Sequence, residues 1–548
     1  MQQTFRTITG AMLCCLLPAV LSAQEAAQQK YKVPVLTGKD INPVIRIRVD
    51  VKEDHETLQQ VDIQLKGAAL PRYLQNVRIY AAGADSAVWK GDKPAGKTLF
   101  AEAPSPAAEK IVLKGNLPLQ RGANYLWVSV SPSAGIPLNA RLHIDAAAVR
   151  VNGKPLKIAA GNYTHRTGVA LRQHNQDNVH THRIPGLATA KDGTLLAIYD
   201  ARRESGRDLQ GNIDIGLSRS FDKGKTWQPM QTVIDMGAWG GLPEKFNGVS
   251  DANILVDKNT GTIYIAGLWM YGVIDTTGKW VEGLTDTSTI WNHQWKTKGS
   301  QPGFGEKQTC QFLIVKSTDN GATWSKPVNV TRMGKKEDWW LWAPAPGSGI
   351  TLKDGTLVFP TQGRDNKGRA FSTISYSKDG GNTWHTGERA APESTTENMA
   401  VELSDGSIML NMRSGANSRD TGATNGRVIA VTQNLGQTWA RHPTSRNALP
   451  EPTCMASIIR HDYVKNGQKR SVLLFSNPDF KTARKNMTIK ISFDDGKTWP
   501  ASKKILLDEE KSRGYSCLTS IDNDTIGILY ESSQADLVFQ AIPLEELL

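Results

Sequence analysis

Residues 317–324 are Ser-Thr-Asp-Asn-Gly-Ala-Thr-Trp, and this octapeptide motif returns four more times along the chain. The other copies begin at residues 220, 377, 432 and 492, and the copy at 432 has Thr and Asn in place of the Ser and Asp. In each copy the Ser and Asp side chains can bind backbone N–H groups within a tight turn. The Gly supplies a positive φ, and the Trp buries a large apolar surface between neighbouring sheets. The motif therefore predicts a repeated β-sheet unit with a hairpin turn in each copy.

The spacing of the copies indicates the size of the repeated unit. Their first residues lie 97, 60, 55 and 60 positions apart, which suits the blades of a β-propeller. The long first gap indicates an insertion, a blade without the motif, or both. Residues 183–548 number 366, which gives about 61 residues for each of six blades. We therefore expect an all-β chain in which residues 165–548 form a six-bladed β-propeller.

Residues 24–160 have a different pattern from the rest of the chain. Short runs alternate apolar and polar residues, as in residues 44–49, 125–130 and 142–144, and turns rich in Gly, Pro and Ala separate them. This alternation is typical of antiparallel strands with one buried face, so we expect a smaller N-terminal β-sandwich. Carbohydrate binding and bracing of the second domain are its two candidate roles, because no aromatic platform for a sugar stands out.

The composition supports two folded domains and argues against several classes of function. With 548 residues and 39% hydrophobic content the chain can bury two cores, and 22% charged residues do not indicate disorder. The net charge is +12, but no long Lys/Arg run or nucleic-acid motif is present. We therefore expect a basic surface that attracts an anionic substrate, with no nucleic acid as partner. No phosphate-binding loop, dinucleotide motif or zinc signature occurs, so no cofactor and no metal are expected.

The N-terminus carries a targeting signal. Arg6 precedes an apolar run over residues 11–20, and a small-residue exit follows at residues 21–23. This pattern predicts a signal peptide over residues 1–23 and a secreted or periplasmic protein. The apolar run is too short to span a bilayer, and no later segment predicts a membrane span.

The five cysteines predict neither a disulfide framework nor a zinc site. The residues before Cys14 and Cys15 fit a lipid-attachment box poorly, so no lipoprotein anchor is expected. Cys310, Cys454 and Cys517 remain after cleavage, and their scattered positions predict buried free thiols.

The octapeptide matches the Asp box of bacterial neuraminidases, a motif that also occurs in sorting receptors and other propellers that are not sialidases. More specific segments follow in order along the chain. They are Arg183-Ile-Pro, the loop with Arg203 and Asp208, the segment from Glu397 to Arg413, Arg484 before a strand, and Gly514-Tyr515-Ser516. Their order and spacing resemble the bacterial exo-α-sialidase (neuraminidase) family over residues 165–548. One position differs from the usual family pattern, since the family commonly has Phe or Tyr at the position of His182.

The chemistry of sialic acid explains why the family uses such residues. The anomeric carbon carries a carboxylate, which the planar guanidinium group of Arg can hold through two hydrogen bonds. A carboxylate nucleophile would be repelled at this centre, whereas a Tyr activated by a nearby Glu carries no full charge before it attacks. Sialidases are accordingly the tyrosine-nucleophile exception among glycosidases.

The resemblance implies a role for each residue on the nucleophile side. Arg183, Arg413 and Arg484 would hold the substrate carboxylate, and Glu397 would activate Tyr515 as the nucleophile. The rivals of Glu397 and Tyr515 are Glu402, which directly precedes a turn, and Tyr530, whose apolar surroundings favour core packing.

The resemblance also implies an acid and further contacts. Asp208 would be the general acid, with Arg203 five residues before it as a substrate-binding residue, and Asp251 would contact the glycerol or N-acetyl region. The rivals for the acid are Asp200 and Asp214, of which Asp214 looks structural. Three tryptophans could line the acetyl pocket or pack in the core. They are Trp339, Trp340 and Trp342.

The resemblance implies an exo-α-sialidase that removes terminal sialic acid from glycoproteins, glycolipids and oligosaccharides with a retaining mechanism. A trans-sialidase or an intramolecular trans-sialidase is one alternative, since these enzymes differ only in the acceptor. A non-catalytic sialic-acid-binding propeller is the other, and the complete set of candidate residues argues against it.

Overall fold

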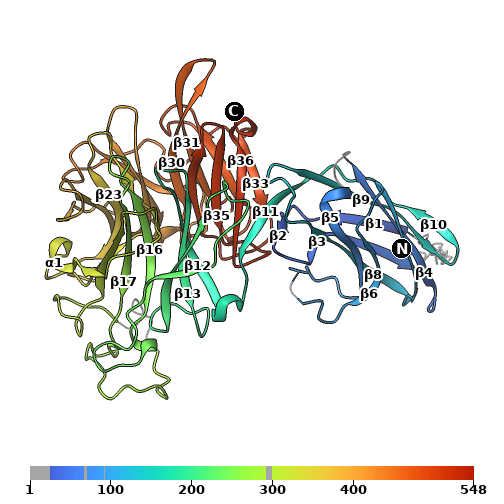
Figure 1. The fold of residues 1–548 in the computed structure, drawn as a ribbon, viewed down its shortest axis with the longest axis horizontal. Coiled ribbons are helices and arrows are strands. Elements are labelled where there is room, and N and C mark those ends of the chain that lie inside the picture. Colours follow the sequence, from blue (N-terminus) through green and yellow to red (C-terminus); the bar gives the residue numbers. More distant parts are fainter. Residues whose placement is uncertain (1–24, 67–70, 92, 292–298) are drawn as a thin grey trace, which may run out of the picture.

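The computed structural model describes residues 25–66, 71–91, 93–291 and 299–548, and these residues form an almost purely β structure (Figure 1). The predicted signal peptide lies outside them. Helix is confined here to the one-turn α1 (Thr331–Gly334) and to short 3-10 turns. The all-β prediction is confirmed. No helix of this described part is long and apolar enough to cross a membrane.

The N-terminal part of the chain forms two facing antiparallel sheets, drawn in blue at the right of Figure 1. The first contains, in spatial order, β1 (Glu25–Lys30), β3 (Asn42–Val51), β8 (Gly122–Pro132), β5 (Leu74–Gly83) and β6 (Thr98–Pro104). The second contains β10 (Lys154–Lys157), β9 (Arg141–Val151), β4 (Thr57–Lys66) and β7 (Lys110–Pro118). Alternate residues of both sheets, such as Ile47 and Ile63, share one hydrophobic core.

The rest of the described chain forms six mainly antiparallel sheets that follow one another in sequence. The first contains β12 (Thr181–Thr189), β13 (Leu195–Arg202), β14 (Ile213–Ser220) and β15 (Gln231–Ile234). The second contains β16 (Val249–Val256), β17 (Ile263–Trp269), β18 (Gln311–Ser317), β19 (Val328–Asn329) and β21 (Gly347–Ser348). The third contains β20 (Leu341–Pro344), β22 (Ile350–Thr351), β23 (Leu357–Arg364), β24 (Ala370–Ser377) and β25 (His385–Thr386).

The last three sheets repeat this arrangement. The fourth contains β26 (Thr395–Glu402), β27 (Ile408–Ser414), β28 (Val428–Thr432) and β29 (Ala440–Arg441). The fifth contains β30 (Ser457–Lys465), β31 (Gln468–Pro478), β32 (Met487–Ser492) and β33 (Lys504–Asp508). The sixth contains β34 (Ser516–Asp522), β35 (Thr525–Tyr530), β36 (Leu537–Pro543), β11 (His165–Arg172) and β2 (Val35–Thr37).

Strand β11 joins the two ends of the chain. One edge of β11 pairs with β36, while β2 runs parallel to it on its other edge. Its first residues, His165 and Arg166, pair with β9 of the N-terminal part. The two parts of the chain are therefore connected by a hydrogen-bonded strand and not by a free linker.

Each copy of the octapeptide forms the turn between a long strand and the short strand that follows it, from β14 to β15, β18 to β19, β24 to β25, β28 to β29 and β32 to β33. In residues 317–324, the Asp319 carboxylate accepts hydrogen bonds from the backbone N–H of Thr323 at 2.9 Å and from its hydroxyl at 2.6 Å. The Ser317 hydroxyl accepts the N–H of Gly321 at 3.0 Å. The same hydroxyl donates to Oδ1 of Asp319 at 2.7 Å, and the hydrogen bonds from Thr323 and Ser317 lower the pKa of Asp319 to about 2. The local hydrogen bonds expected from the motif are present.

The long first gap between motif copies is an insertion. The copies at 220 and 317 belong to consecutive sheets, and residues 270–310 between β17 and β18 contain no long strand in their described part. Among the residues that the structure describes, no sheet without the motif lies between them, whereas the sixth sheet carries none of the five copies.

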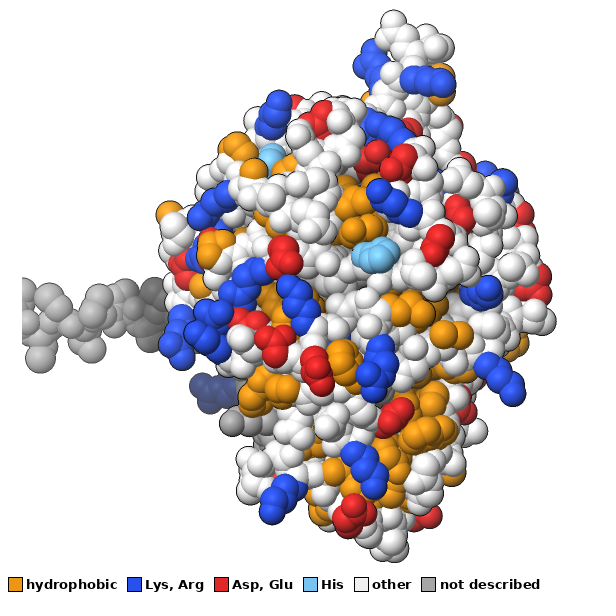
Figure 2. Space-filling model, turned by 90° about the vertical axis from the view of Figure 1, so that its left-hand side faces the viewer, with side chains coloured by type: hydrophobic (Ala, Val, Ile, Leu, Met, Phe, Trp, Pro, Cys, Tyr) orange, Lys and Arg blue, Asp and Glu red, His pale blue; other side chains and the backbone are white. Residues whose placement is uncertain are grey.

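Charged side chains are mixed over the face seen in Figure 2, where Lys and Arg lie among Asp and Glu. The net positive charge is therefore not gathered into one patch on this face.

The first motif copy provides a test of how tightly neighbouring sheets pack. Gly224 has φ +87°, and a Cβ there would collide with the ring of Phe539 in β36. Gly406 has φ +83°, and nothing lies within 4 Å of its Cβ position. We expect Gly406→Ala to lower the free energy of unfolding by about 1 kcal/mol, the cost of a left-handed Ala. Gly224→Ala should lower it by about 3 kcal/mol, because overpacking adds to that cost. Denaturant titrations that give equal losses would contradict this packing.

Candidate active site

Residues from the first four sheets, from a connection within the fifth and from the position directly before the sixth line one cavity of about 310 Å³. The start of a strand lies beside the end of its antiparallel neighbour, so side chains from both places reach the same end of a sheet. Seven of the eight site residues predicted from the sequence line this cavity. They are Arg183, Asp208, Asp251, Glu397, Arg413, Arg484 and Tyr515.

Tyr515 is 6% exposed and lies directly before β34. Its hydroxyl group donates a hydrogen bond to Oε1 of Glu397. Nη1 of Arg413 donates to Oε2 of Glu397 at 2.6 Å and to Oη of Tyr515 at 3.1 Å. Burial and the Glu397 carboxylate raise the pKa of Tyr515 well above its ordinary value. The phenol is therefore protonated at neutral pH, and Glu397 is the group placed to take its proton.

Arg183 is held by a buried carboxylate to which the sequence analysis gave no role. Its Nε and Nη2 donate to the two carboxylate oxygens of Glu531 at 2.9 and 3.3 Å. The backbone N–H groups of Ile184 and Tyr515 donate to the same carboxylate at 3.2 and 3.0 Å. Burial alone would raise the pKa of Glu531, but the charge of Arg183 and these hydrogen bonds bring it below its ordinary value.

Arg484 completes a cationic wall. Its Nη1 and Nη2 donate to the backbone oxygens of Arg513 and Thr453, each at 3.0 Å. Its guanidinium carbon lies 5.6 Å from the centre of the Tyr515 ring, and that of Arg183 lies 5.2 Å from it. With Arg413 bound to the phenol oxygen, three guanidinium groups from distant parts of the chain surround one phenol. Such a cavity favours a carboxylate ligand.

Two aspartates form the acidic part of the cavity. Asp208 lies in the loop between β13 and β14, and its Oδ1 is 3.6 Å from Nη2 of Arg202. The Asp208 side chain is 35% exposed. Burial and the charges of Asp208 and Glu397 raise the pKa of Asp251 well above its ordinary value. Asp251 is therefore protonated more readily than an ordinary carboxyl group, and its protonated form can donate a hydrogen bond.

Two residues of the site have a left-handed backbone. Ile184 and Asp251 both have φ +57°, which is costly for a residue with a Cβ and especially for β-branched Ile. Strand pairing is interrupted at both places, between Arg183 and Gly186 in β12 and in the corresponding part of β16. These bulges re-aim side chains at the ends of the strands. Two strained positions in one cavity are typical of a functional site.

The structure corrects the placement of Arg203. Its Nη2 lies 2.7 Å from Oδ2 of Asp214, and the Arg203 side chain does not line the cavity. Arg202 lines the cavity instead and pairs with the buried Asp200 at 2.9 Å. Neighbouring residues of an extended chain point to opposite sides, so only one of the two arginines can enter. The distance in sequence between each arginine and Asp208 did not indicate which of the two would enter the cavity.

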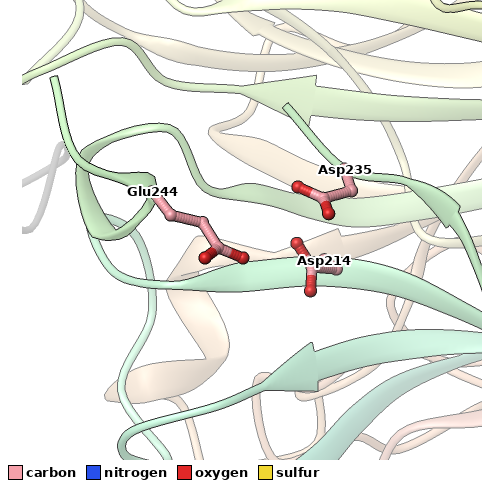
Figure 3. Close-up of side chains that lie close together, drawn as sticks. All are labelled: Asp214, Asp235 and Glu244. Atoms are coloured by element: carbon pink, nitrogen blue, oxygen red, sulfur yellow. The ribbon is translucent and has the colours of Figure 1, made fainter. Parts of the chain in front are cut away.

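Arg203 lies beside a group of three carboxylates. Oxygens of Asp214, Asp235 and Glu244 all lie within 4.8 Å of one another, and Figure 3 shows the three side chains pointing together. Burial and the charge of Asp235 raise the pKa of Asp214 to about 6. This cluster lies outside the cavity, and Arg203 already supplies a positive charge to Asp214.

The rival residues lie away from the cavity. Tyr530 is fully buried in the core of the last two sheets. Glu402 accepts the N–H of Lys353 at 3.1 Å at the far end of β26. Trp339 and Trp342 are buried in a hydrophobic core, where Trp342 stacks on Phe312. Sequence patterns alone did not identify Arg202, Gln362 or Arg364 as lining residues.

The chain matches the BNR repeat-like domain over residues 184–531 and the N-terminal domain of BNR-repeat neuraminidase over residues 23–155. It is 38% identical to a sialidase of Bacteroides fragilis, with 97% of each chain aligned. It is 33% identical to a sialidase of Micromonospora viridifaciens, over 76% of this chain and 58% of that one. The solved structure of the Hadza microbial sialidase Hz136 is 35% identical and superposes with a TM-score of 0.86, covering 95% of this chain and 100% of that one.

The ion pair between Arg183 and Glu531 provides a test of the site's electrostatics. Glu531→Gln leaves a buried guanidinium without its counter-ion, so the free energy of unfolding should fall by about 3 kcal/mol at pH 7. The pKa of Glu531 is lower in the folded chain than in the unfolded one. Its stabilisation is therefore fully present above pH ~4.5 and is lost as the pH falls further.

Urea titrations of the wild type and of Glu531→Gln should show a difference that is constant from pH 7 to pH ~4.5 and shrinks from there towards pH ~3.5. Glu545→Gln, at an exposed position, is the matched control and should change little. A difference that stays constant over this range would contradict the assigned ion pair.

Proposed function

This chain belongs to the BNR-repeat neuraminidase family of glycoside hydrolases, and we propose that it is an exo-α-sialidase that removes terminal sialic acid from glycoproteins, glycolipids and oligosaccharides. The observation that supports this most strongly is the group of three arginines around one phenol. Sialic acid carries a carboxylate on its anomeric carbon, so a site that holds this anion brings the anomeric carbon close to the phenol oxygen.

The proposed reaction has two steps. In the first, Glu397 takes the phenolic proton as Oη of Tyr515 attacks the anomeric carbon, and Asp208 donates its proton to the leaving glycosidic oxygen. Arg183, Arg413 and Arg484 hold the substrate carboxylate during the attack. In the second, Asp208 takes a proton from water, the hydroxide oxygen bonds to the anomeric carbon, and Tyr515 leaves and recovers its proton. Each step inverts the configuration at the anomeric carbon, so the two steps together retain it.

Asp251 and Arg202 complete the proposed substrate contacts. The raised pKa of Asp251 favours its protonated form, which can donate a hydrogen bond to a hydroxyl or carbonyl oxygen of the sugar's side groups. Arg202 is held by Asp200 and takes the place that the sequence analysis gave to Arg203.

We propose the following organisation for the whole chain. Residues 1–23 are a signal peptide of a secreted or periplasmic enzyme, and residues 24–160 are a β-sandwich with a core of its own. Residues 165–548 are a six-bladed β-propeller whose centre carries the site. This is supported by six consecutive sheets and by one cavity lined by residues from the first four, from a connection within the fifth and from the position directly before the sixth.

Replacing the nucleophile tests the mechanism. Tyr515→Phe should lower kcat/KM for α2,3-sialyllactose by at least about 1,000-fold, because no oxygen remains to attack the anomeric carbon. Tyr530→Phe makes the same chemical change at a buried position outside the cavity and is the matched control. Unchanged turnover in Tyr515→Phe would refute the role of Tyr515.

The products formed by the wild type distinguish the enzyme classes. NMR should show free sialic acid appearing first as the α-anomer. A new glycoside would indicate a trans-sialidase, an anhydro sugar an intramolecular trans-sialidase, and binding without release a non-catalytic propeller.

Changing the leaving group tests the proposed acid. Asp208→Asn should lower kcat/KM for sialyllactose by about 100-fold to 1,000-fold, the usual contribution of a general acid. A 4-nitrophenyl sialoside needs little protonation of its leaving oxygen, so its cleavage should fall much less. Equal losses for the two substrates would contradict the role of Asp208.

A further inference from the structure

Arg513 is a fourth arginine beside the site, and the proposed mechanism does not use it. It lies in the loop between β33 and β34. Within the described residues its guanidinium group has no hydrogen-bond or ion-pair partner. Burial and the nearby charge of Arg183 lower the pKa of Arg513. The charges of Glu531 and Asp536 act in the opposite direction, but neither carboxylate is bound to Arg513, which is therefore a cation without a directly bound counter-ion.

Two neighbours locate this cation relative to the reacting centre. A Cβ on Gly206 would lie 3.3 Å from Nη2 of Arg513, and Gly206 stands two residues before Asp208 in the same loop. Arg513 is also close enough to Arg183 for their charges to repel. Arg513 is thus adjacent both to the loop of the proposed acid and to the end of the cavity that would hold the carboxylate.

Arg513 also lines a recess of about 420 Å³ where the N-terminal part of the chain meets the rest. Lys511 lines the recess from the same loop, and Lys90 lines it from the N-terminal part. Nζ of Lys90 donates a hydrogen bond to the backbone oxygen of Lys511 at 3.1 Å, which keeps these two residues together. Three cationic side chains therefore border one recess.

The acidic residues of this recess already have partners. Glu531 binds Arg183, as described above, and Oδ2 of Asp536 accepts the backbone N–H of His182 at 2.9 Å. Neither carboxylate makes a hydrogen bond to Arg513 in the described chain, so an outside anion would find a cation without a bound counter-ion.

The anomeric carbon of a sialoside carries both the carboxylate and the leaving oxygen. The sugar unit bonded through that oxygen must therefore lie next to the Asp208 loop and near Arg183, which is where Arg513 stands. We propose that Arg513, with Lys511 and Lys90, binds an anionic group on the leaving sugar unit and favours substrates whose leaving unit is itself acidic. The anionic group would be either a carboxylate, as on a second sialic acid, or a sulfate ester. This inference rests on the proposed function.

The test compares substrates that differ in the leaving unit. The first is α2,3-sialyllactose, the second is disialyllactose with an α2,8-linked terminal sialic acid, and the third is sialyllactose sulfated on galactose. For Arg513→Gln we expect kcat/KM to fall about tenfold with an acidic leaving unit and less than about twofold with α2,3-sialyllactose, since a charge-assisted hydrogen bond is lost only with the former. A selective loss with disialyllactose alone assigns the recess to a carboxylate, and a selective loss with the sulfated substrate alone assigns it to a sulfate ester.

Lys90→Gln tests the contribution of the N-terminal part. It should lower kcat/KM for the preferred acidic substrate about threefold, and added salt should reduce the difference from the wild type, because the lysine is exposed. Arg470→Gln is the matched control. It lies in the exposed hairpin of β30 and β31, which extends beyond the other sheets at the top of Figure 1.

Equal effects of Arg513→Gln on all three substrates, or no effect on any, would overturn this inference while leaving the proposed function intact. The proposed function fails separately, if the wild type releases sialic acid from none of them.

Discussion

Repulsion between like charges is the constraint on which this site depends. Arg183, Arg413 and Arg484 lie around a single aromatic ring, and a buried guanidinium group without a partner costs several kcal/mol. Glu531 offsets the charge of Arg183, Glu397 that of Arg413, and backbone oxygens bind Arg484. The bulges in β12 and β16 and the arrangement of the six sheets bring these partners together from positions far apart in the chain.

The two carboxylates differ in what they can do. Glu531 accepts hydrogen bonds from the Arg183 guanidinium and from two backbone N–H groups, so both of its oxygens are occupied and its pKa is lowered. Glu397 shares its oxygens between Arg413 and the Tyr515 hydroxyl, which is a group that can give up its proton. The first carboxylate is therefore suited to holding an arginine in place, and the second to proton transfer.

The hydrogen bonds within the turns could be predicted from the sequence. Which side chains of a strand face the cavity could not. The octapeptide turns depend on residues within eight positions of one another, so their hydrogen bonds follow from the motif itself. Arg202 lies inside the cavity and Arg203 outside it because of which side of the chain faces the cavity, and the spacing of residues in the sequence does not reveal that side. Glu531 meets Arg183 across 348 positions, and only the folded sheets establish that contact. Lys90 belongs to the N-terminal part of the chain, so its place beside Arg513 in the recess also follows only from the folded structure.

Strand β11 also has a consequence for how the protein is made. It is synthesised early, but its partner β36 is synthesised only after the first five sheets. Until then one edge of β11 exposes unpaired backbone groups, which are prone to pair with other chains. Shielding of this edge therefore matters until β36 has been synthesised. Deletion of Leu537–Pro543 would leave the same edge of β11 unpaired in the finished protein.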